Sequence, residues 1–71
     1  MKLTYDPTAD AAYLYVVDKI APGAAVETRL PDVPLKDSIF AFDFDVNGCL
    51  LGIEILGASR VLSPETLRRA Q

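Results

Sequence analysis

The sequence predicts an α+β fold, a meander of four to five antiparallel strands packed against one short C-terminal helix. Three observations predict this class. Short segments rich in β-branched and aromatic residues alternate with turn signals, an Asn-Gly pair joins two apolar runs, and Ser-Pro-Glu opens a helical pattern near the end. For 71 residues we expect a single domain, residues 1–71, with a core small enough to need support from association.

The strongest of these signals is the hairpin predicted for residues 39–56. A two-residue Asn47-Gly48 loop of type I′ gives a register that places four apolar pairs on one face of the sheet. The pairs are Val46 with Cys49, Phe44 with Leu51, Phe42 with Ile53, and Phe40 with Ile55. A longer turn over residues 45–48 with a bulge is the alternative, and it shifts the pairing locally.

Turn and capping residues define the remaining elements. We expect strands at residues 2–5, 12–17 and 25–30, a tight turn at 8–10, a loop at 31–38 and a helix at 64–70. The carboxylates of Asp6 and Asp10 can accept backbone N–H groups of the tight turn. Ser63 is a favourable N-cap for the helix, and Pro64 suits its first position. The run at 12–17 is apolar on both faces, which is typical of an interior strand.

Composition argues against several classes of site. The chain has no histidine, which removes the usual general base and the commonest metal ligand. Its one cysteine, Cys49, cannot form an intramolecular disulfide, which fits a reducing compartment. The net charge of −3 argues against nucleic acid as the main partner. No apolar run approaches the roughly 20 residues of a membrane span, so we expect a cytoplasmic protein with no membrane partner.

Two motifs carry a family resemblance. The first is Tyr5-Asp6-Pro7-x-Ala9-Asp10-Ala11-x-Tyr13, and the second is Asp43-x-Asp45-x-x-Gly48-x-Leu50-x-Gly52-Ile53-Glu54-Ile55-Leu56-x-Ala58-Ser59. Together they resemble the small prokaryotic domain-of-unknown-function family 2283 over about residues 2–62. The family brings no established activity. Because some members are encoded beside small toxin-like proteins, the resemblance implies an antitoxin-like role or one accessory to such a partner.

A calcium-loop pattern runs through the predicted hairpin. Asp43, Asp45, Asn47 and Glu54 have the spacing of EF-hand ligands, with Gly48 at the sharp turn. An EF-hand also needs a helix on each side, whereas the phenylalanines before Asp43 recur with the period of a strand. In the hairpin only Asp43 and Glu54 lie close together. We therefore expect a solvated turn instead of a metal site, with no calcium affinity tighter than millimolar.

Other reactive residues have ordinary structural explanations. Asp43 and Glu54 are also a candidate carboxylate pair, but acids on an exposed hairpin face are common. The predicted register turns Cys49 into the core beside Val46, and the chain has no histidine to activate its thiol. Packing in the sheet with hydroxyls at its rim accounts for the tyrosines that are candidates for a ligand pocket, Tyr5, Tyr13 and Tyr15.

We therefore expect no catalytic residue and no cofactor, and we predict a non-enzymatic interaction module that self-associates. One short helix cannot cover both faces of a sheet, and an uncovered apolar face usually marks an association surface. The candidate interface residues are Ile39, Leu50, Leu56, Arg60, Arg68 and Arg69. The alternative function is a small-ligand or divalent-metal-binding protein that uses the acidic face of the hairpin.

Overall fold

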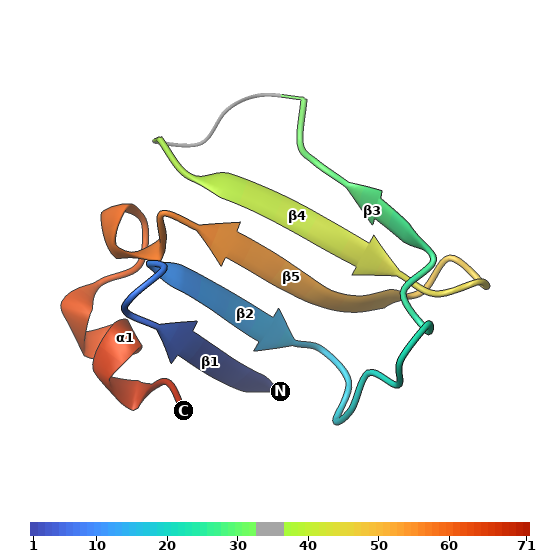
Figure 1. The fold of residues 1–71 in the computed structure, drawn as a ribbon, viewed down its shortest axis with the longest axis horizontal. Helices are drawn as coiled ribbons and strands as arrows, with labels where there is room; N and C mark the ends of the chain where they lie inside the picture. Colours follow the sequence, from blue (N-terminus) through green and yellow to red (C-terminus); the bar gives the residue numbers. More distant parts are fainter. Residues whose placement is uncertain (33–36) are drawn as a thin grey trace.

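The computed structural model describes residues 1–32 and 37–71, which form a five-stranded antiparallel sheet with a helix at one corner (Figure 1). The strands are β1 (Lys2–Asp6), β2 (Ala11–Tyr15), β3 (Glu27–Arg29), β4 (Ile39–Phe44) and β5 (Leu50–Leu56). The 3₁₀ turn η1 (Ala58–Arg60) and the helix α1 (Pro64–Arg69) follow. The predicted α+β class is confirmed. Residues 33–36 of the loop predicted at 31–38 lie outside the described residues.

The strand order is β1-β2-β5-β4-β3, so the last strand of the sequence lies at the centre of the sheet (Figure 1). The edge strands are β1 and β3, and their outer sides differ. The N–H of Gln71 donates to the carbonyl of Leu3 at 2.8 Å, and the carbonyl of Gln71 accepts the N–H of Tyr5 at 3.2 Å. The end of the chain thus occupies the outer side of β1, whereas no described strand lies beside the outer side of β3.

The hairpin of β4 and β5 confirms part of the predicted register. Two predicted pairs are present, Phe42 with Ile53 and Phe40 with Ile55. The predicted pairing of Phe44 with Leu51 is wrong, because a bulge after Asp43 makes Leu50 the partner of Phe44. The longer turn with a bulge is therefore the alternative that forms.

Asp45 explains why the turn is longer than the two-residue loop. Its Oδ1 accepts the backbone N–H groups of Asn47 and Cys49, both at 2.9 Å. Gly48 has a φ of 80°, whereas Asn47 has no positive φ, so the type I′ loop that needs both is not formed. Val46 and Cys49 consequently belong to the turn and are exposed, which corrects the expectation that they face the core.

Antiparallel partners share a face, so the register divides the sheet into two faces. The helix face carries Leu3, Tyr5, Ala12, Leu14, Phe40, Phe42, Phe44, Ile53 and Ile55. The open face carries Lys2, Thr4, Tyr13, Tyr15, Thr28, Ile39, Ala41, Asp43, Gly52, Glu54 and Leu56. In the part of the chain that the structure describes, α1 is the only α-helix, and it packs on the helix face.

The core lies at one end of the helix face. Ala12, Ile55 and Ala58 form its buried centre, and Leu67 of α1 packs against them. The helix starts after Ser63, whose hydroxyl accepts the N–H of Thr66 at 3.1 Å, so the predicted N-cap is confirmed. The six-residue helix is stable only because it docks there.

Two predicted strands are shorter in the structure. β2 is an interior strand, as predicted, but only Ala12 of its residues is buried, because side chains of its open face have no helix above them. β3 keeps three of the residues predicted at 25–30, and all three are exposed. The middle of the sheet is thus better covered than its β3 edge.

Candidate functional surfaces

Asp10 joins two segments that are far apart in the sequence. Its carboxylate accepts the N–H and the hydroxyl of Ser59 at 2.9 and 2.7 Å, and the hydroxyl of Tyr5 at 2.7 Å. Its carbonyl oxygen accepts the N–H groups of Gly57 and Ala58 at 2.9 and 3.0 Å. These contacts, which we call the Asp10 clamp, tie the turn after β1 to the segment that follows β5.

The clamp corrects the prediction that Asp10 caps its own tight turn. The same prediction for Asp6 is confirmed, because its Oδ1 accepts the N–H of Thr8 at 3.0 Å. Hydrogen bonds from Ser59 and then Tyr5 hold the pKa of Asp10 below its ordinary value, and the bond to Asp10 raises the pKa of Tyr5. Near neutral pH both groups therefore keep one protonation state, which suits a structural contact better than proton transfer.

Tyr13 and Asp43 form the main polar contact of the open face. The hydroxyl of Tyr13 donates to Oδ2 of Asp43 at 2.8 Å, and the hydroxyl of Thr28 donates to Oδ1 at 2.6 Å. The contact reaches from β2 across β5 to β4 and β3. Gly52 of β5 makes this crossing possible, because a Cβ at this position would overlap the ring of Tyr13.

The tyrosines do not gather in one pocket. Tyr5 lies on the helix face, whereas Tyr13 and Tyr15 lie on the open face with their ring centroids 4.8 Å apart in an edge-on arrangement. The Nζ of Lys2 lies 4.8 Å from the centre of the Tyr15 ring. Burial, followed by the hydrogen bond to Asp43, raises the pKa of Tyr13, so its phenol stays protonated at neutral pH. Packing and sheet cross-linking account for these side chains.

The residues of the calcium pattern have separate roles in the hairpin. Both carboxylate oxygens of Asp43 accept hydrogen bonds, and Asp45 is the acceptor of the turn amides. Asn47 is exposed in the turn, and Glu54 lies diagonal to Asp43 on the open face. Within residues 1–32 and 37–71, no group of three or more histidine, cysteine or acidic side chains could hold a metal ion. Weak calcium binding stays a prediction, which calorimetric titration would test.

The apolar interface candidates lie in two places. Ile39 and Leu56 are opposite each other on the open face, 49% and 37% exposed. Leu50 lies at the other end of β5, half-buried opposite Phe44. The structure therefore brings together two of these three residues.

The three arginine candidates lie on η1 and α1. Nε of Arg60 donates to the carbonyl of Asp37 at 3.1 Å. Arg69 lies 3.3 Å from a carboxylate oxygen of Glu65, one helical turn away, and Arg68 is exposed. Two of them thus make intramolecular contacts, and exposed contacts of this kind contribute little to stability.

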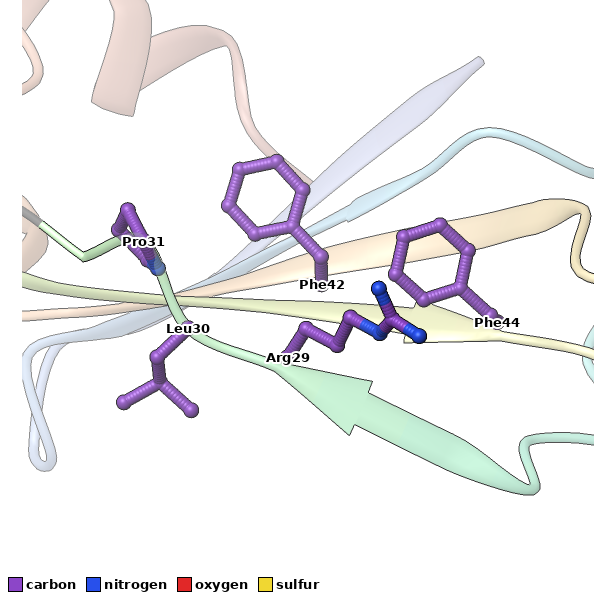
Figure 2. Close-up of a pocket in the computed structure, with 5 residues that line it drawn as sticks. All are labelled: Arg29, Leu30, Pro31, Phe42 and Phe44. Atoms are coloured by element: carbon purple, nitrogen blue, oxygen red, sulfur yellow. The ribbon is translucent and has the colours of Figure 1, made fainter.

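A shallow apolar hollow of about 190 Å³ lies beside β3 and is absent from the sequence predictions. Its lining residues are Arg29, Leu30, Pro31, Phe42 and Phe44. Figure 2 shows the rings of Phe42 and Phe44 on the same side of the sheet as Arg29, while Leu30 projects to the other side. Nε of Arg29 donates to a carboxylate oxygen of Glu27 at 2.7 Å. The sequence did contain one signal for this hollow, namely an alternating strand pattern at residues 25–30 that is followed by a proline.

Fold and surfaces together define a small α+β protein with one antiparallel sheet, one open face and polar clusters that hold the strands together. The described residues contain no helix long and apolar enough to cross a membrane. The chain belongs to the DUF2283 family, a protein family of unknown function, whose family model matches residues 2–59. The resemblance in the sequence is thereby confirmed. No curated protein and no solved structure matches the chain at a significant level.

The matched region contains both sides of the Asp10 clamp. Tyr5 and Asp10 belong to the first motif of the sequence, and Ala58 and Ser59 belong to the second. The structure therefore gives a physical reason for both motifs, namely that they meet at one end of the sheet and fix each other by hydrogen bonds.

Proposed function

We propose that this protein is a non-enzymatic, cytoplasmic interaction module that works as a homo-oligomer. The observation that carries this proposal is the size of its core. Within residues 1–32 and 37–71 the buried apolar residues are Ala12, Ala41, Leu51, Ile55 and Ala58, three of them alanines. No large side chain among the described residues is fully buried. A core built this way leaves much of the available apolar burial to an association surface.

The exposed apolar side chains support the same proposal. In the described part of the chain the large ones are Met1, Val26, Leu30, Ile39, Val46 and Leu56. Single exposed apolar residues are normal on any protein, but Ile39 and Leu56 are neighbours on the open face. The apolar hollow beside β3 lies on the other face. Both faces therefore offer apolar surface that a second copy can cover.

The hydrogen bonds of the acidic side chains and the setting of the one cysteine favour a non-enzymatic role. Asp10 and Asp43 are bound to hydroxyl groups of neighbouring strands and turns. Cys49 is exposed in a chain that has no histidine to activate a thiol. No contact favours the alternative of a ligand or metal on the acidic face, because Asp43 and Asp45 already accept hydrogen bonds.

An antitoxin-like or accessory role is the narrower form of this proposal, and it rests on the family resemblance. A toxin-like partner would compete with self-association for the same apolar surfaces. Titration of such a purified partner into the protein would then convert the homo-oligomer into a mixed complex of defined mass.

Sedimentation equilibrium tests the proposal directly. For a chain of 7.7 kDa we expect the mass of a dimer or larger species at high micromolar concentration. The same measurement with calcium and with EDTA separates the two functions, since the interaction module keeps its mass in both. A 7.7 kDa monomer throughout this range contradicts the proposal, and assembly only in the presence of a divalent ion favours the metal-binding alternative.

A further inference from the structure

The two edges of the sheet differ in their availability for a further strand. Gln71 forms two backbone hydrogen bonds with β1, so that edge already has a partner. β3 has β4 on its inner side and no strand on its outer side among the described residues. All residues of β3 are exposed. An unpaired edge of this kind is a template for pairing with another chain.

The sequence of β3 is complementary to itself when two copies run antiparallel. We propose that two copies of the protein pair through their β3 strands about a twofold axis at Thr28. Glu27 of each copy then lies opposite Arg29 of the other, so the interface contains two cross-strand ion pairs. Val26 of each copy lies opposite Leu30, and each is 59% exposed in the free chain.

Several antiparallel registers of two β3 strands would keep the helix face and the open face continuous across the dimer. The charges of Glu27 and Arg29 favour the register with its axis at Thr28. A shift of the axis to Glu27 places the two Glu27 side chains opposite each other, and a shift to Arg29 does the same with Arg29. A parallel pairing of the two outer edges turns one sheet over and places the helix face of one copy beside the open face of the other. Like charges directly opposite each other destabilise a strand pair, so the axis at Thr28 is favoured.

In this register the charged and the apolar side chains of the proposed interface lie on different faces of the sheet. Thr28 lies on the open face with its hydroxyl on Asp43, and Leu30 projects to the side opposite Arg29 (Figure 2). The same alternation places Val26 with Thr28. The ion pairs therefore form on the helix face, beside Phe42 and Phe44, and the Val26–Leu30 contacts form on the open face. Pro31 ends the pairing because it has no N–H.

This inference rests on the proposed function. Variants that reverse the charge of Arg29 or Glu27 test the β3 pairing separately from self-association itself. We expect Arg29→Glu and Glu27→Arg each to weaken self-association by at least about tenfold, because each converts both ion pairs into like-charge pairs. An equimolar mixture of the two variants restores association as a heterodimer, with one variant carrying only acids and the other only arginines at these positions. Lys19→Glu, at an exposed position in the loop after β2, makes the same change in net charge as Arg29→Glu and leaves the dimer intact.

The outcomes distinguish the two proposals. If the unmodified protein is a monomer, both fall. If it associates and neither β3 variant weakens the dimer, or if Lys19→Glu weakens it as much, only the β3 pairing is overturned. Failure of the mixture to re-associate, with both variants folded by circular dichroism, also overturns it.

A cysteine at the proposed axis supplies a second measurement. Thr28→Cys in a Cys49→Ser background places two thiols directly opposite each other, within reach of a disulfide. We expect mild oxidation to produce a covalent dimer, whereas Thr8→Cys in the same background, in the exposed turn after β1, stays largely monomeric on a denaturing gel. Equal cross-linking of the two variants contradicts pairing at β3.

Discussion

At the scale of single residues, Asp10 makes long-range contacts that the sequence did not predict. The sequence predicts that Asp6 and Asp10 both cap the tight turn, but only Asp6 does so, because the carboxylate of Asp10 binds Ser59. Asp10 has a φ of 51°, a left-handed conformation that aspartate and asparagine tolerate better than most residues. This conformation directs both its carbonyl and its side chain to the segment after β5.

The charge of Asp10 predicts how stability depends on acid pH. Because hydrogen bonds lower the pKa of Asp10 from its ordinary 3.8, its contribution is present above that value and is lost as pH falls through the folded-state pKa. Asp10→Asn keeps the left-handed conformation and removes the charge. We expect a lower melting temperature at pH 7 and a flatter decline below about pH 4. Thermal melts of both proteins at a series of pH values measure this.

Asp18→Asn in the loop after β2 is the matched control, because Asp18 is exposed and the variant removes the same charge. It should leave the melting temperature at pH 7 close to that of the unmodified protein. Equal effects of the two substitutions would show that net charge matters and that the clamp does not.

At the scale of elements, the hairpin turn offers a direct test of the observed conformation. Gly48 has a φ of 80° and open space around its Cα, so Gly48→Ala introduces backbone strain without a clash. We expect it to destabilise the protein by roughly 1 kcal/mol. Asn47 has no positive φ, so Asn47→Ala should change stability by less than about 0.5 kcal/mol. In the type I′ loop both substitutions would be costly, and urea unfolding of the two variants distinguishes the turns.

The elements that could be predicted from the sequence are those that depend on signals from neighbouring residues. The helix from Ser63 and two of the hairpin pairs depend on neighbouring residues, and the sequence contains those neighbours. The bulge depends on one side chain, Asp45, which competes for the turn amides in a way that hydrophobic alternation does not reveal. The short β3 depends on where β4 ends its pairing, and that is set by the fold as a whole.

At the scale of the whole molecule, the strand order could not be derived from the sequence. The α+β class follows from segment types, but the placement of β5 between β2 and β4 depends on contacts between distant residues. The Asp10 clamp and the crossing of Tyr13 over Gly52 are such contacts. The apolar hollow was missed for the same reason, since it forms only when β3 lies beside Phe42 and Phe44. Of the predicted surface residues, only Ile39 and Leu56 come together as neighbours on one face.

The clamp also has a consequence for the order of events in folding. It joins residues 49 positions apart, whereas the β1–β2 and β4–β5 hairpins close short loops. Closing the longer loop loses more chain entropy, so the two hairpins should form before they dock and the clamp should close after the rate-limiting barrier. Asp10→Asn would then accelerate unfolding and leave the folding rate almost unchanged in stopped-flow experiments. A slower folding rate that accounts for the whole loss of stability would instead place the clamp in the transition state.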